Sequence, residues 1–537
     1  MSENAHLRYE PLEPAPHPLA AAMGGQIALL IVTGIIVTPV VTARAAGLDA
    51  ASTSWIVFAA MVAAGLSTWL QVTRLGIIGS GYVMFVGSNV AFVSVSVAAI
   101  KAGGLPLLAT VAAIASLATF AFTRWLPILR RILTPAVGGV VLMLMAMSVA
   151  PVIWGMLKRV PAPLEGSPLV PMVAGLTLIV IMAVALFAKG LLRLWAPMLG
   201  ALVGSAMAAF FGMVDTSRVA AAPWIGMPEA SWPGLDLTFP AAFWGLLPAF
   251  VLITIVGGIE TYADGIAVQR SSHRQPRPID FKAVQGGINA DGFGSFIAGL
   301  LGTVPNTVYS SSVAVTELTG VASRRVAWWG GLVLILLAFS PKVAAVIGAM
   351  PSPVVGAYIL VLIVLLFGHG VRLVTEGGLG FEAGLIVCMG FWIGYGFQDG
   401  RLYNEQLPAW AQLFLSNGTT SGGLTAIALM ALLSLRHRSV DALTVPLAIT
   451  SVAAVRTLIQ GFAKRLHWDD PAEDRLMLAA EEAMLFLIQS GLADGAAAGS
   501  TEITLRLRMV ENEVELEFVT APAGANVEGA IAALTDA

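Results

Sequence analysis

The chain has 537 residues, of which 57% are hydrophobic and only 11% charged, and its mean hydropathy is +0.84. A soluble domain of average composition carries about 25% charged residues, so most of this chain is predicted to lie in a membrane. The net charge of −3 and the lack of a basic tract argue against nucleic acid as a partner. The single cysteine, Cys388, lies in an apolar run, which excludes disulfide frameworks and cysteine-based metal sites.

Residues 1–23 differ in character from the apolar run that follows. They mix acidic side chains such as Glu10 and Glu13 with four prolines. They lack the basic start and short apolar core of a cleaved signal peptide. We therefore predict a disordered cytoplasmic tail over residues 1–23 and a first membrane span that is retained.

Closely spaced apolar runs extend from Gly24 to Leu433. Because a helix needs about 20 apolar residues to cross a bilayer, the pattern predicts an all-α polytopic membrane domain over residues 24–435. We place about 14 spans near residues 24–43, 52–71, 76–100, 104–124, 135–155, 168–188, 195–214, 240–265, 282–301, 303–320, 325–349, 353–371, 380–397 and 409–433.

The loops between these spans differ in their content of lysine and arginine. With a cytoplasmic N-terminus, the inner loops hold roughly 15 such residues and the outer loops roughly 7. The excess of positive charge on the inside predicts that both termini face the cytoplasm of a bacterial inner membrane. An even number of spans requires the same arrangement.

Two of the predicted spans are irregular. The third is interrupted by Gly76, Gly79, Gly81 and Gly87, and the tenth by the run 302–307, which contains Pro305. If the spans divide into two sets of seven, these two occupy equivalent positions, and such paired interruptions indicate a transporter's midplane site. The alternative is that the glycines only permit close helix packing.

The eighth predicted span carries two acids, Glu260 and Asp264. An acid within a span costs about 2.5–3.5 kcal/mol on insertion scales and is by default a functional hypothesis. A spacing of four places both carboxylates on one helix face, where they resist simultaneous ionisation and one tends to hold a proton. The alternative is a structural acid that braces neighbouring helices, and for Asp264 both interpretations stay open.

The tenth span is predicted to restart as a half-helix after Pro305, which cannot continue a helix. The free backbone N–H groups at its start would face a polar or anionic ligand. Ser310, Ser311 and Ser312 could add hydroxyls to this ligand site or simply cap the helix. Further polar groups at depth could brace helices or touch substrate: Asn289, Asp291 and Glu317.

The segments 257–270, 290–292 and 302–320 together resemble the nucleobase–ascorbate transporter family, the xanthine/uracil permeases. The similarity covers about residues 20–435 and is strongest from 250 to 330. The resemblance implies 14 spans arranged as two inverted repeats of seven, a core and a gate domain, and usually a homodimer. It also implies proton-coupled, sometimes sodium-coupled, uptake of purine or pyrimidine bases by an elevator-like movement.

The resemblance assigns roles to individual residues. Glu260 matches the family's glutamate that accepts ring N–H bonds, Asp264 matches the acid four residues on, and Asp291 matches the ninth-span aspartate. The tenth-span signature falls on Ser311, Ser312, Ala314, Thr319 and Gly320, of which only the last two fit.

Three positions near the expected site depart from the family pattern. Ser311 cannot supply the second carboxylate or amide that bidentate recognition of a base uses. Ile27 stands where the first span usually has histidine, and Val90 where the third span usually has a stacking aromatic. These departures indicate altered specificity or a loss of transport.

The region 440–537 is predicted to be a small cytoplasmic α/β module. Helices are expected at Ala448–Leu466 and Glu473–Gln489, and strands at Thr501–Met509 and Glu513–Val519. The module weakly resembles the anti-sigma-factor type of histidine-kinase ATPase, with Glu482 at the base position. Phe486 replaces the magnesium-binding asparagine, and the 520–524 loop lacks an aspartate, so no ATPase or kinase activity is expected.

The leading hypothesis is a secondary transporter, not an enzyme, that carries a small planar heterocycle with a proton or possibly sodium as coupling ion. It needs no cofactor, metal site or catalytic residue. Its partners would be the lipid bilayer, a second copy of the chain and a regulatory protein for the C-terminal module. The substrate contacts are assigned to Glu260, Ser310, Ser311, Ser312, Asn89 and Val90, and proton coupling to Glu260, Asp264 and Asp291.

Two alternatives stay open. One is a transporter of a small anion or another solute, which the serine-rich helix start favours and the negative charge of Glu260 opposes. The other is a membrane sensor that signals through the C-terminal module.

Overall fold

The computed structural model describes most of the chain. The described residues are 7–129, 134–159, 166–214, 217–228, 230–275, 277, 279–376, 380–402, 405–408, 411–412, 415–436, 441–466, 468, 470–489, 502–510 and 513–520.

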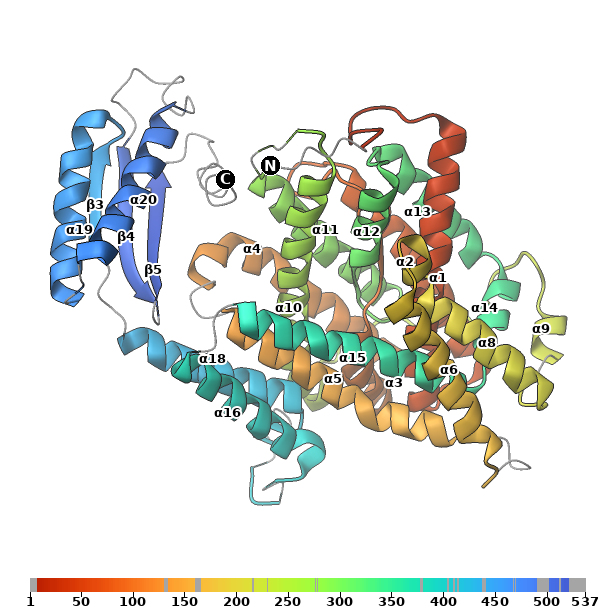
Figure 1. The fold of residues 1–537 in the computed structure, drawn as a ribbon. Helices are drawn as coiled ribbons and strands as arrows, with labels where there is room; N and C mark the ends of the chain where they lie inside the picture. Colours follow the sequence, from red (N-terminus) through yellow and green to blue (C-terminus); the bar gives the residue numbers. More distant parts are fainter. Residues whose placement is uncertain are drawn as a thin grey trace.

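Residues 17–436 form a helical membrane domain (Figure 1). Within the described residues, seven helical segments are long and apolar enough to cross a membrane, and the bent pair α13–α14, which turns by 80°, could form one more span. In chain order the helices are α1 (His17–Ala46), α2 (Ala50–Val72), α3 (Val93–Ser116), α4 (Ala118–Leu129), α5 (Pro135–Lys158), α6 (Leu169–Phe187), α7 (Leu191–Leu194), α8 (Ala196–Phe210), α9 (Ser217–Ala221), α10 (Ala241–Ser271), α11 (Phe281–Leu300), α12 (Ser310–Thr319), α13 (Arg324–Ala338), α14 (Pro341–Gly348), α15 (Ser352–Glu376), α16 (Phe381–Phe397) and α18 (Gly418–Arg436).

The fold class predicted from the sequence, an all-α polytopic membrane protein, is confirmed. Each of the predicted spans overlaps a described helix, and α3 is shared by the third and fourth of them. The helices pack in two groups: α1–α3 with α10–α13, and α5, α6 and α8 with α15, α16 and α18. Close packing between helices depends on glycine, because a Cβ on Gly139 of α5 would lie 2.5 Å from the Gly370 carbonyl oxygen of α15.

The third and tenth segments are broken as predicted, and they meet each other. Each runs through a three-residue strand before its helix: β1 (Val86–Ser88) leads through a 3₁₀ turn, η1 (Val90–Phe92), into α3, and β2 (Asn306–Val308) leads into α12. The two strands pair antiparallel, with Gly87 opposite Thr307. The two irregular spans therefore occupy matching places in the fold.

The N-terminal segment differs from the disordered tail expected for residues 1–23. Helix α1 begins at His17, and the chain before it lies against the turn between α12 and α13. The backbone N–H groups of Arg8 and Tyr9 both donate to the carbonyl of Gly320, at 2.7 and 3.2 Å. Leu7 is buried, and this burial together with the backbone bonds holds residues 7–16 in place; residues 1–6 lie outside the described residues.

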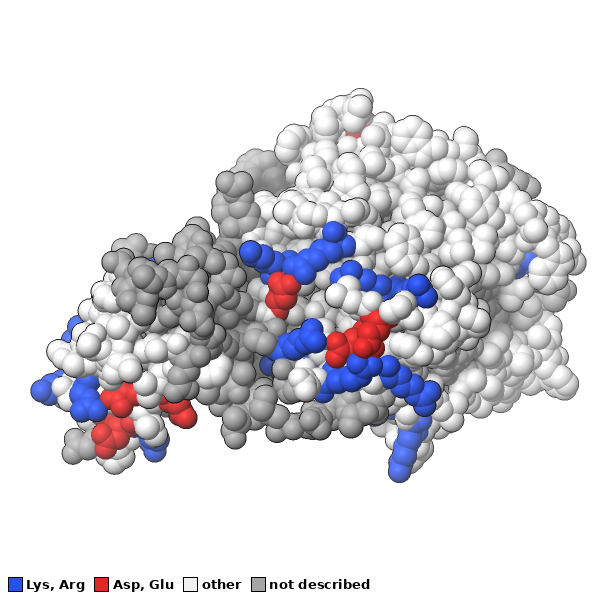
Figure 2. Space-filling model, turned by 90° about the horizontal axis from the view of Figure 1, so that it is seen from above, with Lys and Arg blue, Asp and Glu red and all other residues white. Residues whose placement is uncertain are grey.

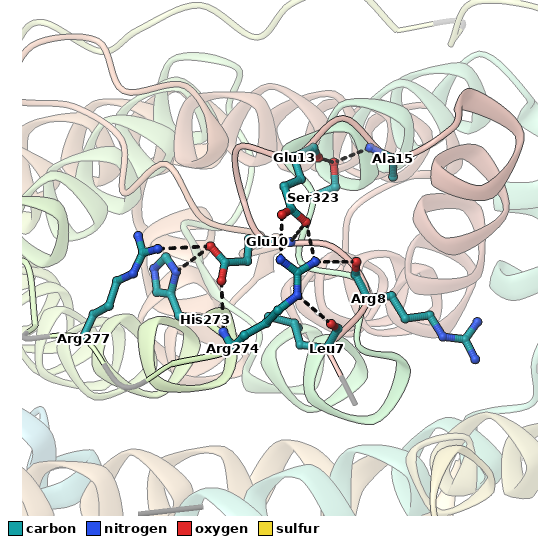
Figure 3. A network of polar contacts seen from close by, with 9 residues as sticks. All are labelled: Leu7, Arg8, Glu10, Glu13, Ala15, His273, Arg274, Arg277 and Ser323. Atoms are coloured by element: carbon teal, nitrogen blue, oxygen red, sulfur yellow. Dashed lines mark hydrogen bonds and ion pairs between the residues drawn. The ribbon is translucent and has the colours of Figure 1, made fainter. Parts of the chain in front are cut away.

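Charged side chains fasten this segment, which we call the N-terminal clasp (residues 7–16), to the α10–α11 loop (Figure 3). The Arg274 guanidinium donates to both carboxylate oxygens of Glu13, at 2.7 and 2.6 Å, and to the carbonyls of Leu7 and Arg8. Glu10 accepts from the Arg274 backbone N–H at 3.1 Å and lies 3.5 Å from His273 Nδ1.

The face that carries the clasp is rich in charge, with lysines and arginines gathered around a few acids (Figure 2). It includes the ion pairs Arg74–Asp280 at 2.7 Å and Arg274–Glu13 at 2.6 Å. The hydrogen bonds from Arg274 and from the Glu10 backbone N–H lower the pKa of Glu13 from 4.5 to about 2.

The residues after 440 form a separate small module with its own core (left in Figure 1). Strands β3 (Asp441–Pro446), β4 (Glu502–Val510) and β5 (Glu513–Thr520) make an antiparallel sheet in that order. Helices α19 (Val452–Leu466) and α20 (Asp470–Gln489) bury side chains such as Phe462 and Met484 in its core. The predicted helices and strands are present, β3 was not foreseen, and most of the 520–524 loop lies outside the described residues.

The clasp should open when its central cation is removed. Arg274→Ala deletes four hydrogen bonds to residues 7–13, so amide hydrogen exchange across residues 7–16 should rise. Because the folded-state pKa of Glu13 lies below its ordinary value, its contribution is complete above pH 4.5 and should be lost as the pH falls toward 2. Arg277→Ala, which removes one exposed contact to Glu10 at 3.4 Å, is the control. Equal exchange in the two variants would contradict this role for Arg274.

Candidate functional site

The centre of the candidate site is the place where β1 and β2 meet and their helices begin. Asn89 caps the start of η1, and its Oδ1 accepts from the Ala91 backbone N–H at 2.9 Å. Its own N–H donates to the carbonyl of Pro305 at 3.0 Å. Across the pair, the Tyr309 N–H donates to the carbonyl of Phe85 at 2.8 Å. Two helix N-termini are thus presented from opposite sides of one short strand pair.

Helix α10 passes directly beside this strand pair. A Cβ on Gly257 would lie 3.9 Å from Asn89 Nδ2 and 4.0 Å from Thr307 Oγ1. Glu260 lies three residues further along the same helix, on the same side, and is partly exposed. Within the described residues Glu260 forms no hydrogen bond or ion pair. It is a carboxylate that is available to a ligand, next to the paired strands β1 and β2, which we call the strand crossing.

Asp264 lies one helical turn beyond Glu260 and faces the start of α12. Ser310, the first residue of α12, donates from its hydroxyl to Asp264 Oδ2 at 2.9 Å. A carboxylate at this place complements the positive end of the α12 dipole. Asp264 and Ser310 therefore join α10 to the half-helix.

Asp291 lies on α11, behind α10. Its Oδ2 accepts from the hydroxyl of Thr261, the residue after Glu260, at 3.1 Å. Its Oδ1 is buried without a hydrogen-bond partner among the described residues. Glu260 and Asp264 are thus carried by α10 and Asp291 by α11, and the two helices contact each other.

The other predicted contacts fall into two groups. Ser311 and Val90 are partly exposed near the two helix starts. Ser312 is buried, accepts from the Phe85 N–H at 3.1 Å and donates to the Tyr309 carbonyl at 2.7 Å, so its hydroxyl holds the half-helix to the strand. Ile27 is buried in the hydrophobic core.

Two residues of the strand crossing were not singled out from the sequence. The Tyr309 hydroxyl donates to the carbonyl of Ser88 at 2.8 Å, and its ring lies against Gly87. Thr307 is buried, and its hydroxyl has no partner among the described residues. The sequence offered one signal for Thr307, its position two residues after Pro305 in the interrupted span. A single sequence cannot show which face of a three-residue strand contacts α10.

Asn289, which could have braced helices or touched substrate, braces them. Its Nδ2 donates to the Ile77 carbonyl at 2.8 Å, and its Oδ1 accepts from the Thr123 hydroxyl at 2.8 Å. In the part of the chain that the structure describes, no group of three or more histidine, cysteine, aspartate or glutamate side chains could hold a metal ion.

Two interrupted spans whose short strands pair with each other, beside helices that carry Glu260, Asp264 and Asp291, define a membrane transporter of the inverted-repeat class. The family model Xan_ur_permease, described as "Permease family", matches residues 20–400. The chain belongs to this family of permeases, and it is a transporter rather than an enzyme.

Relatives across bacteria cover nearly the same length. Xanthine permease XanP of Escherichia coli strain K12 is 30% identical over 445 residues, which are 80% of this chain and 95% of that protein. The putative purine permease CPE0397 of Clostridium perfringens strain 13 is 30% identical over 410 residues, 74% of this chain and 87% of that protein. Uric acid permease PucK of Bacillus subtilis strain 168 is 27% identical over 414 residues, 76% and 94%.

Solved structures share the fold at low sequence identity. The overall structure of SLC26A9 has a TM-score of 0.52 and 12% identity, and the match covers 80% of this chain and 67% of that chain. The inward-facing murine Slc26a9 anion transporter has a TM-score of 0.50 and 14% identity, covering 80% and 70%. These similarities show the inverted-repeat fold and carry no substrate information.

Proposed function

We propose that this permease is a proton-coupled symporter of a purine base. The observation that carries the proposal is Glu260, a carboxylate without a partner among the described residues, beside the β1–β2 crossing. A carboxylate accepts two hydrogen bonds from adjacent N–H groups, which a planar heterocycle offers along one edge. The relatives named as xanthine and uric acid permeases support a purine as the class of substrate.

The other groups would complete the site around Glu260. The start of α12, with Ser310 and Ser311, faces the ligand from one side, and η1 with Asn89 and Val90 from the other. Asp264 and Asp291 are each held by one hydroxyl hydrogen bond. A carboxyl group positioned in this way can take up and release a proton without losing its place, which is what coupling requires.

A small anion as substrate is less well supported. An anion would use the positive end of α12, but Asp264 already lies against that end through Ser310. An approaching anion would also meet Glu260. A neutral heterocycle with N–H donors meets neither objection.

The charged face supports a cytoplasmic location for both termini in an inner membrane. Lysine and arginine gather on the side where the clasp lies (Figure 2), and positive charge marks the cytoplasmic side. Apolar side chains on α6 and α8, among them Phe187 and Phe210, at 82% and 86% exposure, face outward. They would contact lipid or a second copy of the chain, as expected for a homodimer.

Glu260→Gln should abolish high-affinity uptake. The substitution keeps the size of the side chain and removes the charge-assisted acceptor, a loss of about 1.5–3 kcal/mol or about 10- to 150-fold in affinity. Uptake of radiolabelled xanthine by cells that express each variant measures the effect. Glu317→Gln, the same change at an exposed position on α12, should leave uptake unchanged. Full uptake by the Glu260 variant would rule out this role.

Asp291→Asn should separate binding from coupling. The amide can still accept from Thr261 but cannot carry a proton, so xanthine exchange across proteoliposomes should continue. Accumulation driven by an acid exterior should fall to near the exchange level. If acid-driven accumulation persists in the variant, Asp291 is not in the proton path.

The C-terminal module is proposed to regulate transport through a cytoplasmic partner. Because its core is separate from those of the membrane domain, a chain that ends at Arg436 should fold and keep the KM for xanthine. A change in the maximal rate or in cellular control of uptake would support regulation. Complete loss of xanthine binding would show instead that the module is part of the transport unit.

A further inference from the structure

Asn89 presents a hydrogen-bond donor to α10 whose orientation is fixed. Its Oδ1 is held by the Ala91 backbone N–H at 2.9 Å as the cap of η1. The amide nitrogen must therefore point the other way, and within the described residues it makes no hydrogen bond. Asn89 is only 6% exposed, so this donor is directed into the protein, toward Gly257.

Thr307 presents a second donor to the same place from the opposite strand. Its hydroxyl is buried and lacks a partner among the described residues, and the residue is 8% exposed. A buried hydroxyl without a hydrogen bond is destabilising, so the fold keeps it against a free-energy cost. Thr307 lies opposite Gly87 in the strand pair. Gly87 is two residues before Asn89, the cap of η1.

Gly257 leaves the space between these donors and α10 without a side chain. Apart from the nearby backbone of α10 itself, a Cβ built there would meet two atoms of the described residues within 4 Å: Asn89 Nδ2, at 3.9 Å, and Thr307 Oγ1, at 4.0 Å. Both distances are ordinary van der Waals contacts, so the unliganded protein could accept an alanine. Glycine inside a helix costs stability relative to alanine. Its use here therefore has a reason other than packing.

We propose that Asn89 Nδ2 and Thr307 Oγ1, which we call the donor pair, bind an oxo group of the substrate over Gly257. This inference rests on the proposed function and deepens it. The two donors select a hydrogen-bond acceptor on the substrate. Glu260, one turn along the same face of α10, accepts a hydrogen bond from the neighbouring ring N–H of the substrate. The site then matches an O=C–N–H edge, and an exocyclic amino group at the same position would set donor against donor.

The donor pair would also account for the serine at position 311. The resemblance to the nucleobase–ascorbate transporter family led us to expect a carboxylate or amide there. In this chain the second half of the recognition comes from one residue of each broken span, Asn89 after β1 and Thr307 in β2. Thr307 and Gly257 are thus specificity-determining residues of the site.

The first test compares two neighbouring glycines. Gly257→Ala should lower the affinity of the purified full-length protein for xanthine by about 10-fold or more, because one methyl group occupies the space of the oxo group. Its thermal stability without ligand should be unchanged or higher. Gly258→Ala is the matched control: its Cβ would meet Phe122 and Ile288 at 3.4 and 3.5 Å, away from the donor pair, and xanthine binding should be retained. Equal xanthine affinity in the two variants would overturn the proposal.

The second test changes the donor and the acceptor separately. Thr307→Val keeps the shape and should weaken xanthine binding about 3- to 10-fold, while Thr307→Ser should restore it. The 2-thio and 6-thio analogues of xanthine keep the ring N–H groups and replace one oxygen by a weaker acceptor. Wild-type protein should prefer xanthine to one of them, and Thr307→Val should reduce that preference.

The outcomes distinguish the inference from the function it rests on. Loss of binding in Glu260→Gln with an unchanged oxygen-to-sulfur preference in Thr307→Val would overturn the donor pair and leave the purine symporter standing. Absence of xanthine, urate and hypoxanthine binding by the wild-type protein would overturn both.

Discussion

The site depends on the pairing of β1 with β2. Two interrupted spans leave backbone N–H and C=O groups free at the depth of the bilayer, where no water can satisfy them. The strands satisfy these groups with each other, and side chains complete the set: Ser295 receives the Asn306 N–H at 3.1 Å, and Ser312 receives that of Phe85. The half-helices that follow are therefore fixed relative to each other before any ligand binds, which lowers the entropic cost of recognition.

Helix α10 lies close to the strand pair, and this proximity accounts for the two glycines at the point of approach. Gly257 and Gly258 are adjacent, one toward the strand crossing and the other toward Phe122 and Ile288. The turn that follows carries Glu260, Thr261 and Asp264, of which Thr261 contacts Asp291 and Asp264 contacts Ser310. The hydroxyl contacts of Thr261 with Asp291 and of Ser310 with Asp264 leave Glu260 as the acid without a partner in the described part of the chain.

Much of this arrangement could be predicted from the sequence, because strong local signals carry it. Gly87 and Pro305 mark the broken spans, and two acids four residues apart mark the face of α10. The sequence could not indicate that Ser312 turns to the backbone of Phe85, since three-residue strands are too short to show a period. It also could not indicate the N-terminal clasp, because Glu13 and Arg274 are far apart in the chain and ion pairing leaves no periodic pattern. The burial of Leu7 and the hydrogen bonds from Arg274 together order this segment. Its prolines and acids alone would indicate disorder.

The position of Asp264 bears on what the site can recognise. Helix N-termini at a transporter's midplane attract anions, and the solved structures with this fold include an anion transporter. Here the α12 end is joined through Ser310 to a carboxylate of the protein itself, so its dipole is already complemented. The remaining polar groups at the crossing are one acceptor, Glu260, and two donors, Asn89 Nδ2 and Thr307 Oγ1. A neutral ring with alternating N–H and C=O groups satisfies all three at once, whereas an anion satisfies the donors only by approaching Glu260. In this chain the carboxylate of Asp264 at the start of α12 therefore favours a neutral ligand over an anion at that helix end.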